Sequence, residues 1–313
     1  MTISAYNLAI GVKQRRYPYE AVIKSGLRVA DEFCIAYDKR FDDPEIFTAI
    51  DSRVRPIEMN IDFLEWDFIC KALTTARRAC NGDWCLYLEM DEVIHEKDYD
   101  KILKAVDVAQ KGNREAINIK YLCMYQDYVL PKYFFANGNR RQKLTINKPF
   151  IYHKTSDYMI GKMDSAIWEG KFIKKGYDSV AYYDERTSAW FHYPNACFPD
   201  ENYLKPENPK REDIEYNTEN YTYIWHYTRY NHSRKTGQGW QTGKWQDRVY
   251  GRSAIFDVEE LEGNLKETIV LNKILSQNGL EHIKSKGAIA ANLKHPNLVS
   301  GWIKSMGIDA NGE

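Results

Sequence analysis

The sequence predicts an α/β fold in which a mainly parallel sheet carries helices on both faces. Over about the first 130 residues, apolar segments with strand character alternate with segments whose apolar residues recur at helical spacing. The connections between these segments are short and contain Gly, Pro or Asn. This alternation is typical of strands joined by crossover helices, which makes neighbouring strands parallel.

The first part of the chain supplies three strand–helix units and a fourth strand. The expected strands are residues 5–12, 32–38, 54–60 and 84–91, and the expected helices are residues 17–29, 44–53 and 64–80. Pro44 suits the first turn of its helix, because its missing N–H needs no partner there. Asn81 and Gly82 end the third helix, since both tolerate the left-handed conformation that often closes a helix.

The alternation continues to about residue 130 and then changes. A helix over 99–112, which Gly112 ends, is followed by a strand within 116–128. Later strand-like segments, which Gly-containing turns separate, are residues 143–154, 166–177 and 179–184. Residues 195–220 are rich in Pro, Asn and charge, so we expect a long irregular loop there. Apolar residues at helical spacing predict an amphipathic helix over 257–278, and a shorter helix follows.

These patterns divide the chain into three parts. Residues 1–135 are expected to form an α/β half, and residues 136–255 a mixed region of strands and loops that completes its site. Residues 256–313 are expected to be a helical segment.

The composition favours a soluble, cytoplasmic protein. The 313 residues carry 44 basic and 44 acidic side chains, so no general electrostatic attraction to nucleic acid or anionic membranes is expected. The six cysteines form no C-x-x-C pair and mostly lie in apolar segments, as reduced core thiols do. No signal peptide is apparent, and no apolar stretch is long enough to span a bilayer.

Several familiar catalytic motifs are absent. The segment HEKDY at 95–99 has Tyr99 where a zinc-protease helix needs its second His. The segment GQGWQTGK at 237–244 lacks the glycine spacing of a phosphate-binding loop. No G-x-S-x-G segment and no glycine-rich dinucleotide fingerprint is present.

The segment DWCLYLEMDE at 83–92 is the strongest indication of a functional site. An apolar strand runs directly into Glu89, Asp91 and Glu92. Alternation along a strand places Glu89 and Asp91 on one side, where two carboxylates can share one divalent cation. Ligands of parallel sheets bind at the carboxyl ends of the strands, which is where this cluster lies. The alternative is an acidic strand end that solvent alone stabilises.

At this point the chain resembles a known family. RYPYEAVIKSGLRVADEFCIAYDKRFDDPE at 16–45 and KALTTARRACNGDWCLYLEMDEVIHEKD at 71–98 resemble the nucleotide-sugar half of the family 2-like glycosyltransferases, which have the Rossmann-type GT-A fold. Members carry a strand that ends in D-x-D or a close variant, here Glu89-Met90-Asp91. The resemblance covers roughly residues 4–130 and resumes at WHYTR, residues 225–229.

The resemblance implies a set of roles at a metal and nucleotide-sugar site. Asp91 is the expected metal ligand, Glu89 is expected to hold the ribose or a metal-bound water, and His226 is expected to complete the metal site. Asp38 is the expected nucleoside contact, with Asp42 and Asp43 as rivals. Lys71 is also assigned to the donor. The basic side chains of Arg229, Lys235 and Lys244 suit its phosphate oxygens, and the alternative is that they are simply solvated. For His226, the alternative is a structural histidine in the core or in an aromatic cluster. The metal would be Mn²⁺ or Mg²⁺, and the donor is expected to be UDP-linked.

An inverting transfer also needs a carboxylate that removes the proton from the acceptor hydroxyl. Asp164, which apolar residues flank in GKMDSAIW, is the expected base, and Asp184 and Glu185 are rivals. For each of these carboxylates, a place in an ordinary turn is the alternative.

The expected function is metal-dependent transfer of a sugar from a nucleotide-diphosphate sugar to an acceptor hydroxyl. One alternative is a nucleotidyltransferase of similar fold, although only one Gly follows the first strand. The other is a carbohydrate- or nucleotide-binding module that has lost catalysis, which the 23 Tyr and 8 Trp residues would suit. The acceptor, whether a glycan or another hydroxyl-bearing molecule, is left open, and zero net charge disfavours a nucleic acid.

Overall fold

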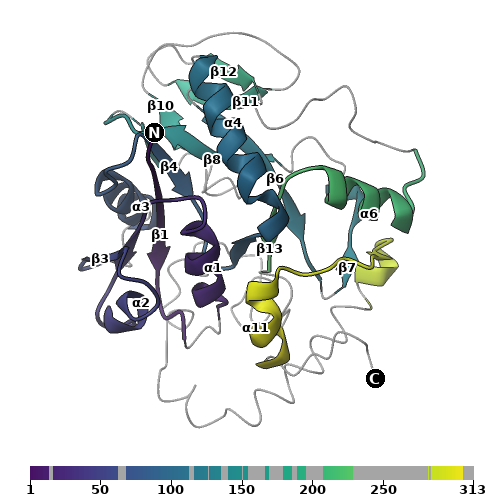
Figure 1. Cartoon of the computed structure of the whole chain (residues 1–313), viewed down its shortest axis with the longest axis horizontal. Coiled ribbons are helices and arrows are strands. Elements are labelled where there is room, and N and C mark those ends of the chain that lie inside the picture. The colour runs from purple at the N-terminus through teal and green to yellow at the C-terminus, as the bar shows by residue number, and fades with distance from the viewer. Residues whose placement is uncertain are drawn as a thin grey trace.

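A computed structural model of the chain describes most of residues 1–153 and parts of the remainder (Figure 1). The described residues are 1–13, 17–62, 68–112, 116–125, 127–134, 140–149, 151–153, 166–168, 179–184, 189–194, 207–227, 281 and 283–305. Within them, the largest sheet has eight strands in the order β3-β2-β1-β4-β8-β6-β13-β5. In chain order, they are β1 (Ile3–Ala9), β2 (Glu32–Tyr37), β3 (Val54–Glu58), β4 (Trp84–Tyr87), β5 (Glu92–Ile94), β6 (Ala116–Cys123), β8 (Arg140–Ile146) and β13 (Tyr223–His226).

The sheet is mainly parallel, as the sequence predicts. β1 is parallel to both β2 and β4, β2 is parallel to β3, and β6 is parallel to β13. β8 runs antiparallel between β4 and β6, and β5 runs antiparallel to β13 at the edge. Together with the helices on both faces, this arrangement confirms the expected GT-A-like α/β class.

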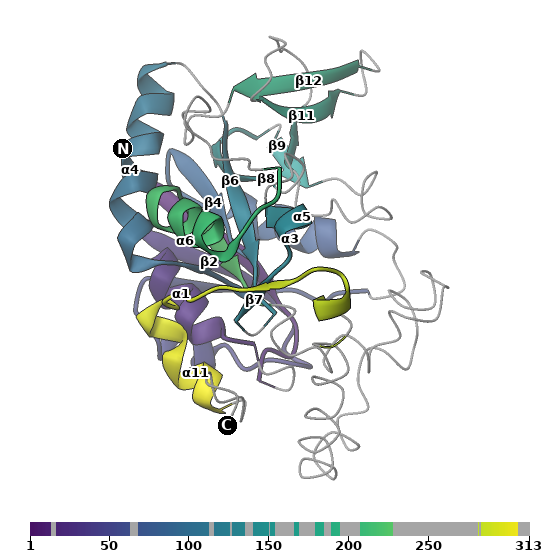
Figure 2. The same cartoon turned by 90° about the vertical axis from the view of Figure 1, so that its right-hand side faces the viewer.

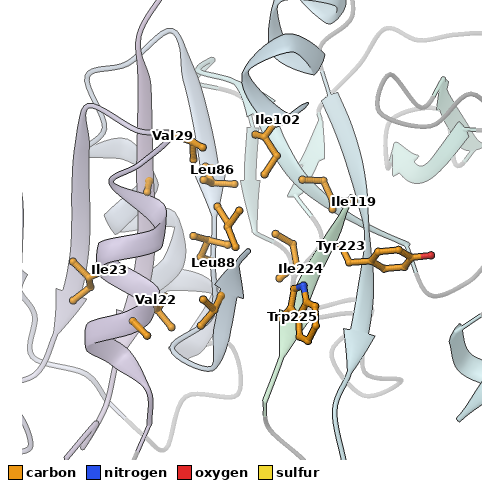
Figure 3. Close-up of a cluster of buried hydrophobic side chains, with 14 of the residues drawn as sticks. Val22, Ile23, Val29, Leu86, Leu88, Ile102, Ile119, Tyr223, Ile224 and Trp225 are labelled. Atoms are coloured by element: carbon orange, nitrogen blue, oxygen red, sulfur yellow. The ribbon is translucent and has the colours of Figure 1, made fainter. Parts of the chain in front are cut away.

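Helices cover both faces of this sheet because the strands carry apolar side chains on both faces. On one face, α1 (Tyr19–Gly26) and α4 (Tyr99–Lys111) pack against residues such as Leu86 and Ile224 (Figures 2 and 3). On the other face, α3 (Phe68–Arg78) packs against a smaller cluster. Burial of this kind contributes about 25 cal/mol for each Å² of apolar surface, so each face is strongly specified.

The expected strand over 84–91 is wrong at its end. β4 stops at Tyr87. β5 begins at Glu92 and runs through the sheet in the direction opposite to β4. The residues between form a turn, in which the Glu92 N–H donates to the Glu89 carbonyl at 2.9 Å. Leu88 and Met90 are nevertheless buried, which explains why the apolar pattern ran on through the turn.

The expected irregular loop over 195–220 is also wrong in part, because α6 (Arg211–Asn220) is a helix. The Lys210 N–H donates to the Asp213 carboxylate at 2.6 Å, which caps the first turn. Ile214 is fully buried and anchors the helix. The expected helix over 44–53 is reduced to the short α2 (Glu45–Thr48), whose Phe47 enters the core.

Smaller elements complete the described part. They are β7 (Tyr128–Val129), α5 (Pro131–Phe134), η1 (Glu96–Asp98), and two antiparallel pairs, β9 (Ile151–His153) with β10 (Ala166–Trp168) and β11 (Ser179–Asp184) with β12 (Ala189–Pro194). β12 was not expected. The helix predicted over 257–278 lies outside the described residues.

The C-terminal segment, residues 283–305, lies against the body of the sheet domain (Figure 1, yellow). β14 (Ile289–Ala290) pairs with β7, and η5 (Asn297–Val299) leads into α11 (Ser300–Ser305). Val299 and Ile303 join the main core. The domain boundaries expected at 135 and 255 stay predictions, although β8 and β13 place later residues in the sheet of the first half.

Across the described residues, no helix combines the length and the apolar composition needed to cross a membrane.

Candidate functional site

Three side chains expected at a metal site lie together at one edge of the sheet. Glu89, Asp91 and His226 each offer one ligand atom, and these three atoms lie within 4.8 Å of one another. Asp91 is buried, and the other two are half-buried. We call these three residues the acidic cluster.

Strand pairing brings His226 to the two carboxylates across more than 130 positions of sequence. β13 lies between β5 and β6, with His226 opposite Glu92 on one side and beside Cys123 on the other. The Tyr227 N–H also donates to the Asp91 carbonyl at 2.8 Å. The backbone therefore fixes the place of both chain segments, and the cluster does not depend on side chains alone.

The charges within the acidic cluster are strongly coupled. His226 Nε2 lies 3.6 Å from Asp91 Oδ1. Burial alone would lower the pKa of His226, but the Asp91 carboxylate opposes it, aided by Cys123 and Glu89, and the pKa rises to about 9. Without a metal, the imidazole therefore carries a proton at neutral pH. Because a metal binds only the neutral ring, a metal must displace that proton.

A buried ion pair lies directly behind the cluster. Lys143 Nζ lies 2.7 Å from Glu92 Oε2, and both side chains have no exposed surface. The same Glu92 oxygen accepts the Glu89 N–H at 2.8 Å, which closes the turn that carries Glu89. The ammonium also lies 4.4 Å from the ring centre of Tyr87 and 4.8 Å from that of Tyr121. Sequence reasoning missed Lys143, because a lysine within a strand is expected to face solvent.

Two further carboxylates hold the segments that follow β1, β2 and β3. Asp38 accepts hydrogen bonds from the Arg40 side chain and from the Arg40 and Ile61 backbone N–H groups. Burial opposes ionisation, but these bonds outweigh it and lower the Asp38 pKa to about 2. Asp42 accepts the N–H groups of Gly11 and Val12 at 2.5 and 2.8 Å.

A polar pocket of about 510 Å³ opens beside the ends of β1 and β2. Its lining combines cationic, acidic and apolar side chains: Lys13, Lys39, Arg40, Phe41, Asp42, Asp43, Pro44 and Ile46. It therefore lies at the carboxyl edge of the sheet, where ligands of α/β proteins bind. β1 lies between β2 and β4 in the sheet, and Glu89 and Asp91 directly follow β4. The pocket and the acidic cluster therefore lie at the same carboxyl edge.

Of the remaining predicted site residues, Lys71 and Asp184 belong to the described part of the chain. Lys71 is exposed on α3, and neither the acidic cluster nor the pocket includes it. Asp164, Arg229 and Lys235 lie outside the described residues, as do Lys244 and Glu185. Asp184 ends β11. The functional roles of all these residues stay predictions.

Comparison with known proteins gives distant structural likenesses. No family model matches the chain, and no curated protein matches it by sequence. A structure of residues 1–349 of TarS from S. aureus is 10% identical, with a TM-score of 0.34, over 91% of this chain and 90% of that one.

The same TarS fragment in complex with UDP matches at 14% identity and a TM-score of 0.30, over 40% of this chain and 36% of that one. A 4-diphosphocytidyl-2C-methyl-D-erythritol synthase from Anaerococcus prevotii matches at 17% identity and a TM-score of 0.29, over 39% of this chain and 55% of that one. All three TM-scores lie below 0.5, and these likenesses transfer no function to this chain.

Proposed function

We propose that this protein is a metal-dependent glycosyltransferase that moves a sugar from a nucleotide-diphosphate sugar to an acceptor hydroxyl. The observation that carries the proposal is the acidic cluster, in which Glu89, Asp91 and His226 converge at the carboxyl edge of a mainly parallel sheet. The resemblance of residues 16–45 and 71–98 to family 2-like glycosyltransferases supports the same assignment.

The side chains of the cluster fit a divalent cation. Two carboxylates offer hard oxygen ligands, and one imidazole adds a nitrogen ligand that favours Mn²⁺ over Mg²⁺. In this proposal Asp91 and His226 hold the metal, while Glu89 holds the ribose or a metal-bound water. A cation bound there would offset the charge that develops on the diphosphate leaving group.

The donor is proposed to lie along the carboxyl edge, with its nucleoside near the ends of β1 and β2. The pocket beside Asp42 and Phe41 offers space, an aromatic ring and cationic side chains at that position. Asp38 keeps its predicted role as a nucleoside contact, although its oxygens already accept bonds from Arg40 and Ile61. A nucleoside would therefore have to share or replace one of these bonds. The proposed donor is UDP-linked.

The acceptor hydroxyl must lose a proton as it attacks the sugar. Asp164 is the proposed base, on the sequence argument given above. Arg229, Lys235 and Lys71 are proposed to contact the donor on the same grounds.

Asp91→Asn tests the proposal most directly. The parent protein should slowly hydrolyse at least one nucleotide sugar from a panel supplied with Mn²⁺, and chelation should stop the reaction. Asp91→Asn should abolish it, because the amide removes one ligand charge, while circular dichroism should show an intact fold. Asp107→Asn is the matched control, since Asp107 is exposed on α4.

Two outcomes would contradict the proposal. Full activity of Asp91→Asn, or of the parent in a chelator, would exclude the metal. Tight binding of nucleotide sugars by the parent without any turnover would indicate a binding module instead.

A further inference from the structure

We propose that Tyr121 is a positioning residue for the acidic cluster, where its ring fixes the plane of His226 and its hydroxyl holds the Glu89 carboxylate. The inference rests on the proposed metal-dependent function and adds a residue to its site. Tyr121 lies in β6, is 5% exposed, and was not among the residues that the sequence singled out.

Tyr121 contacts two members of the cluster with different parts of its side chain. Its ring stacks on the imidazole of His226, with the ring centres 5.2 Å apart and the planes inclined by 29°. Its hydroxyl donates a long hydrogen bond of 3.5 Å to Glu89 Oε1. One rigid aromatic group therefore links the two half-buried members of the acidic cluster, which come from distant segments of the chain.

The strand register explains the stacking. In the parallel pair of β6 and β13, Cys123 lies beside His226 and Tyr121 lies beside Ile224. Tyr121 and His226 are thus diagonal neighbours on one face of the sheet, a spacing that aromatic side chains can bridge. The ring edges of His226 are also occupied, since Nδ1 lies 3.7 Å from Cys123 Sγ and Nε2 lies 3.6 Å from Asp91 Oδ1. With its plane held by Tyr121, the imidazole keeps Nε2 directed towards Asp91.

The Tyr121 ring is itself held in place. The buried Lys143 ammonium lies 4.8 Å from the ring centre and is fixed by Glu92, which also accepts the Glu89 N–H. Glu89 is therefore held twice, through its backbone by Glu92 and through its carboxylate by Tyr121. Groups that orient metal ligands in this way usually change metal affinity by about 10- to 100-fold when they are removed.

Two variants separate the hydroxyl from the ring. Tyr121→Phe keeps the stacking and the contact with Lys143 but loses the bond to Glu89, whereas Tyr121→Leu loses both. Tyr87→Phe is the matched control, because Tyr87 packs against the same ammonium in β4. The melting temperature of each variant is measured first. Metal binding is then compared at a temperature where all variants are folded.

The experiment measures Mn²⁺ binding by electron paramagnetic resonance, with Mn²⁺ alone and with Mn²⁺ and UDP. Tyr121→Phe should bind Mn²⁺ about 10-fold more weakly than the parent. It should keep the nitrogen hyperfine coupling from His226. The loss of this coupling in His226→Ala assigns it to that imidazole. Tyr121→Leu should bind more weakly still, with that coupling lost or altered. A purely structural tyrosine would change melting temperature but leave the coupling and the affinity alone.

The outcomes distinguish failure of this inference from failure of the proposed function. If the parent binds Mn²⁺ and Tyr121→Phe binds it as tightly, with an unchanged coupling in Tyr121→Leu, the positioning role is wrong and the metal site stands. An equal loss of affinity in Tyr87→Phe would likewise overturn it, since the effect would be general. If the parent binds no Mn²⁺ with or without UDP, the metal-dependent function fails and the positioning role fails with it.

Discussion

Replacing Lys143 with methionine should strongly destabilise the fold, although methionine has a similar length and is apolar. The substitution leaves the Glu92 carboxylate without its cation in a place that solvent does not reach. It also removes the contacts of the ammonium with the rings of Tyr87 and Tyr121. The turn that carries Glu89 is weakened as well, because Glu92 closes it.

The magnitude follows from the burial of both partners. Removing one partner of a fully buried ion pair costs about 3–5 kcal/mol, because an uncompensated charge stays behind. In a chain of this length, each kcal/mol lowers the melting temperature by roughly 2 °C, so a fall of roughly 6–10 °C is expected. Glu92→Gln should cost less than Lys143→Met, since its amide oxygen can still accept the Glu89 N–H.

A double-mutant cycle in urea tests this reasoning. The variants are Lys143→Met, Glu92→Gln and the double variant, and tryptophan fluorescence follows unfolding. The double variant should be more stable than the sum of the single losses predicts, because it contains no unpaired buried charge. Lys111→Met, at an exposed pair on α4, should change the midpoint little. Strict additivity, or a loss for Lys143→Met no larger than that of the control, would refute the reasoning.

Three further predictions concern protons and close packing. Mn²⁺ binding near pH 8 should release a proton from His226, whose pKa of about 9 keeps it charged without metal; calorimetry in buffers of different ionisation enthalpy measures this release, and His226→Ala should abolish it. Asp38 has a folded pKa of about 2, below its unfolded value, so its stabilisation is present above about pH 4 and is lost as the pH falls through about 2. Asp38→Asn should therefore lower the free energy of unfolding, measured in urea, by about 1–2 kcal/mol at pH 6 but hardly change it near pH 2, and an equal loss at both pH values would exclude the ion pair as the source of this stabilisation. Gly82→Ala should destabilise by about 1–3 kcal/mol, because its Cβ would lie 2.7 Å from the backbone N of Ser4, whereas Gly301→Ala, with open space around it, should not.

Periodicity predicted the first half of the fold well, and it failed where buried apolar residues lie outside strands and helices. Residues 32–38 and 99–112 repeat apolar side chains at strand and helix spacing, and β2 and α4 lie there. Leu88 and Met90 are buried in a turn, so their apolar character concealed the end of β4. α6 was missed because Ile214 is its only large apolar side chain with full burial.

The site was predictable only in part from residue patterns. Glu89 and Asp91 are close in sequence, so a pattern can pair them. The grouping with His226 came from the family resemblance, because the order of strands in a sheet cannot be read from periodicity. Lys143 and Tyr121 gave no signal at all, since their importance lies in which charges they face after folding.

The position of β13 has a consequence for the order in which the protein folds. β5 pairs only with β13 in the described sheet, so residues 92–94 have no strand partner until residues 223–226 have left the ribosome. Closing a loop of more than 120 residues costs chain entropy before any stabilising contact forms, so the pairing of β5 with β13 is a slow step. Residues 3–87 can meanwhile form β1, β2, β3 and β4 from local crossovers. The edge that carries Asp91 is thus completed last during synthesis, and a truncated nascent chain would hold the carboxylates without their imidazole.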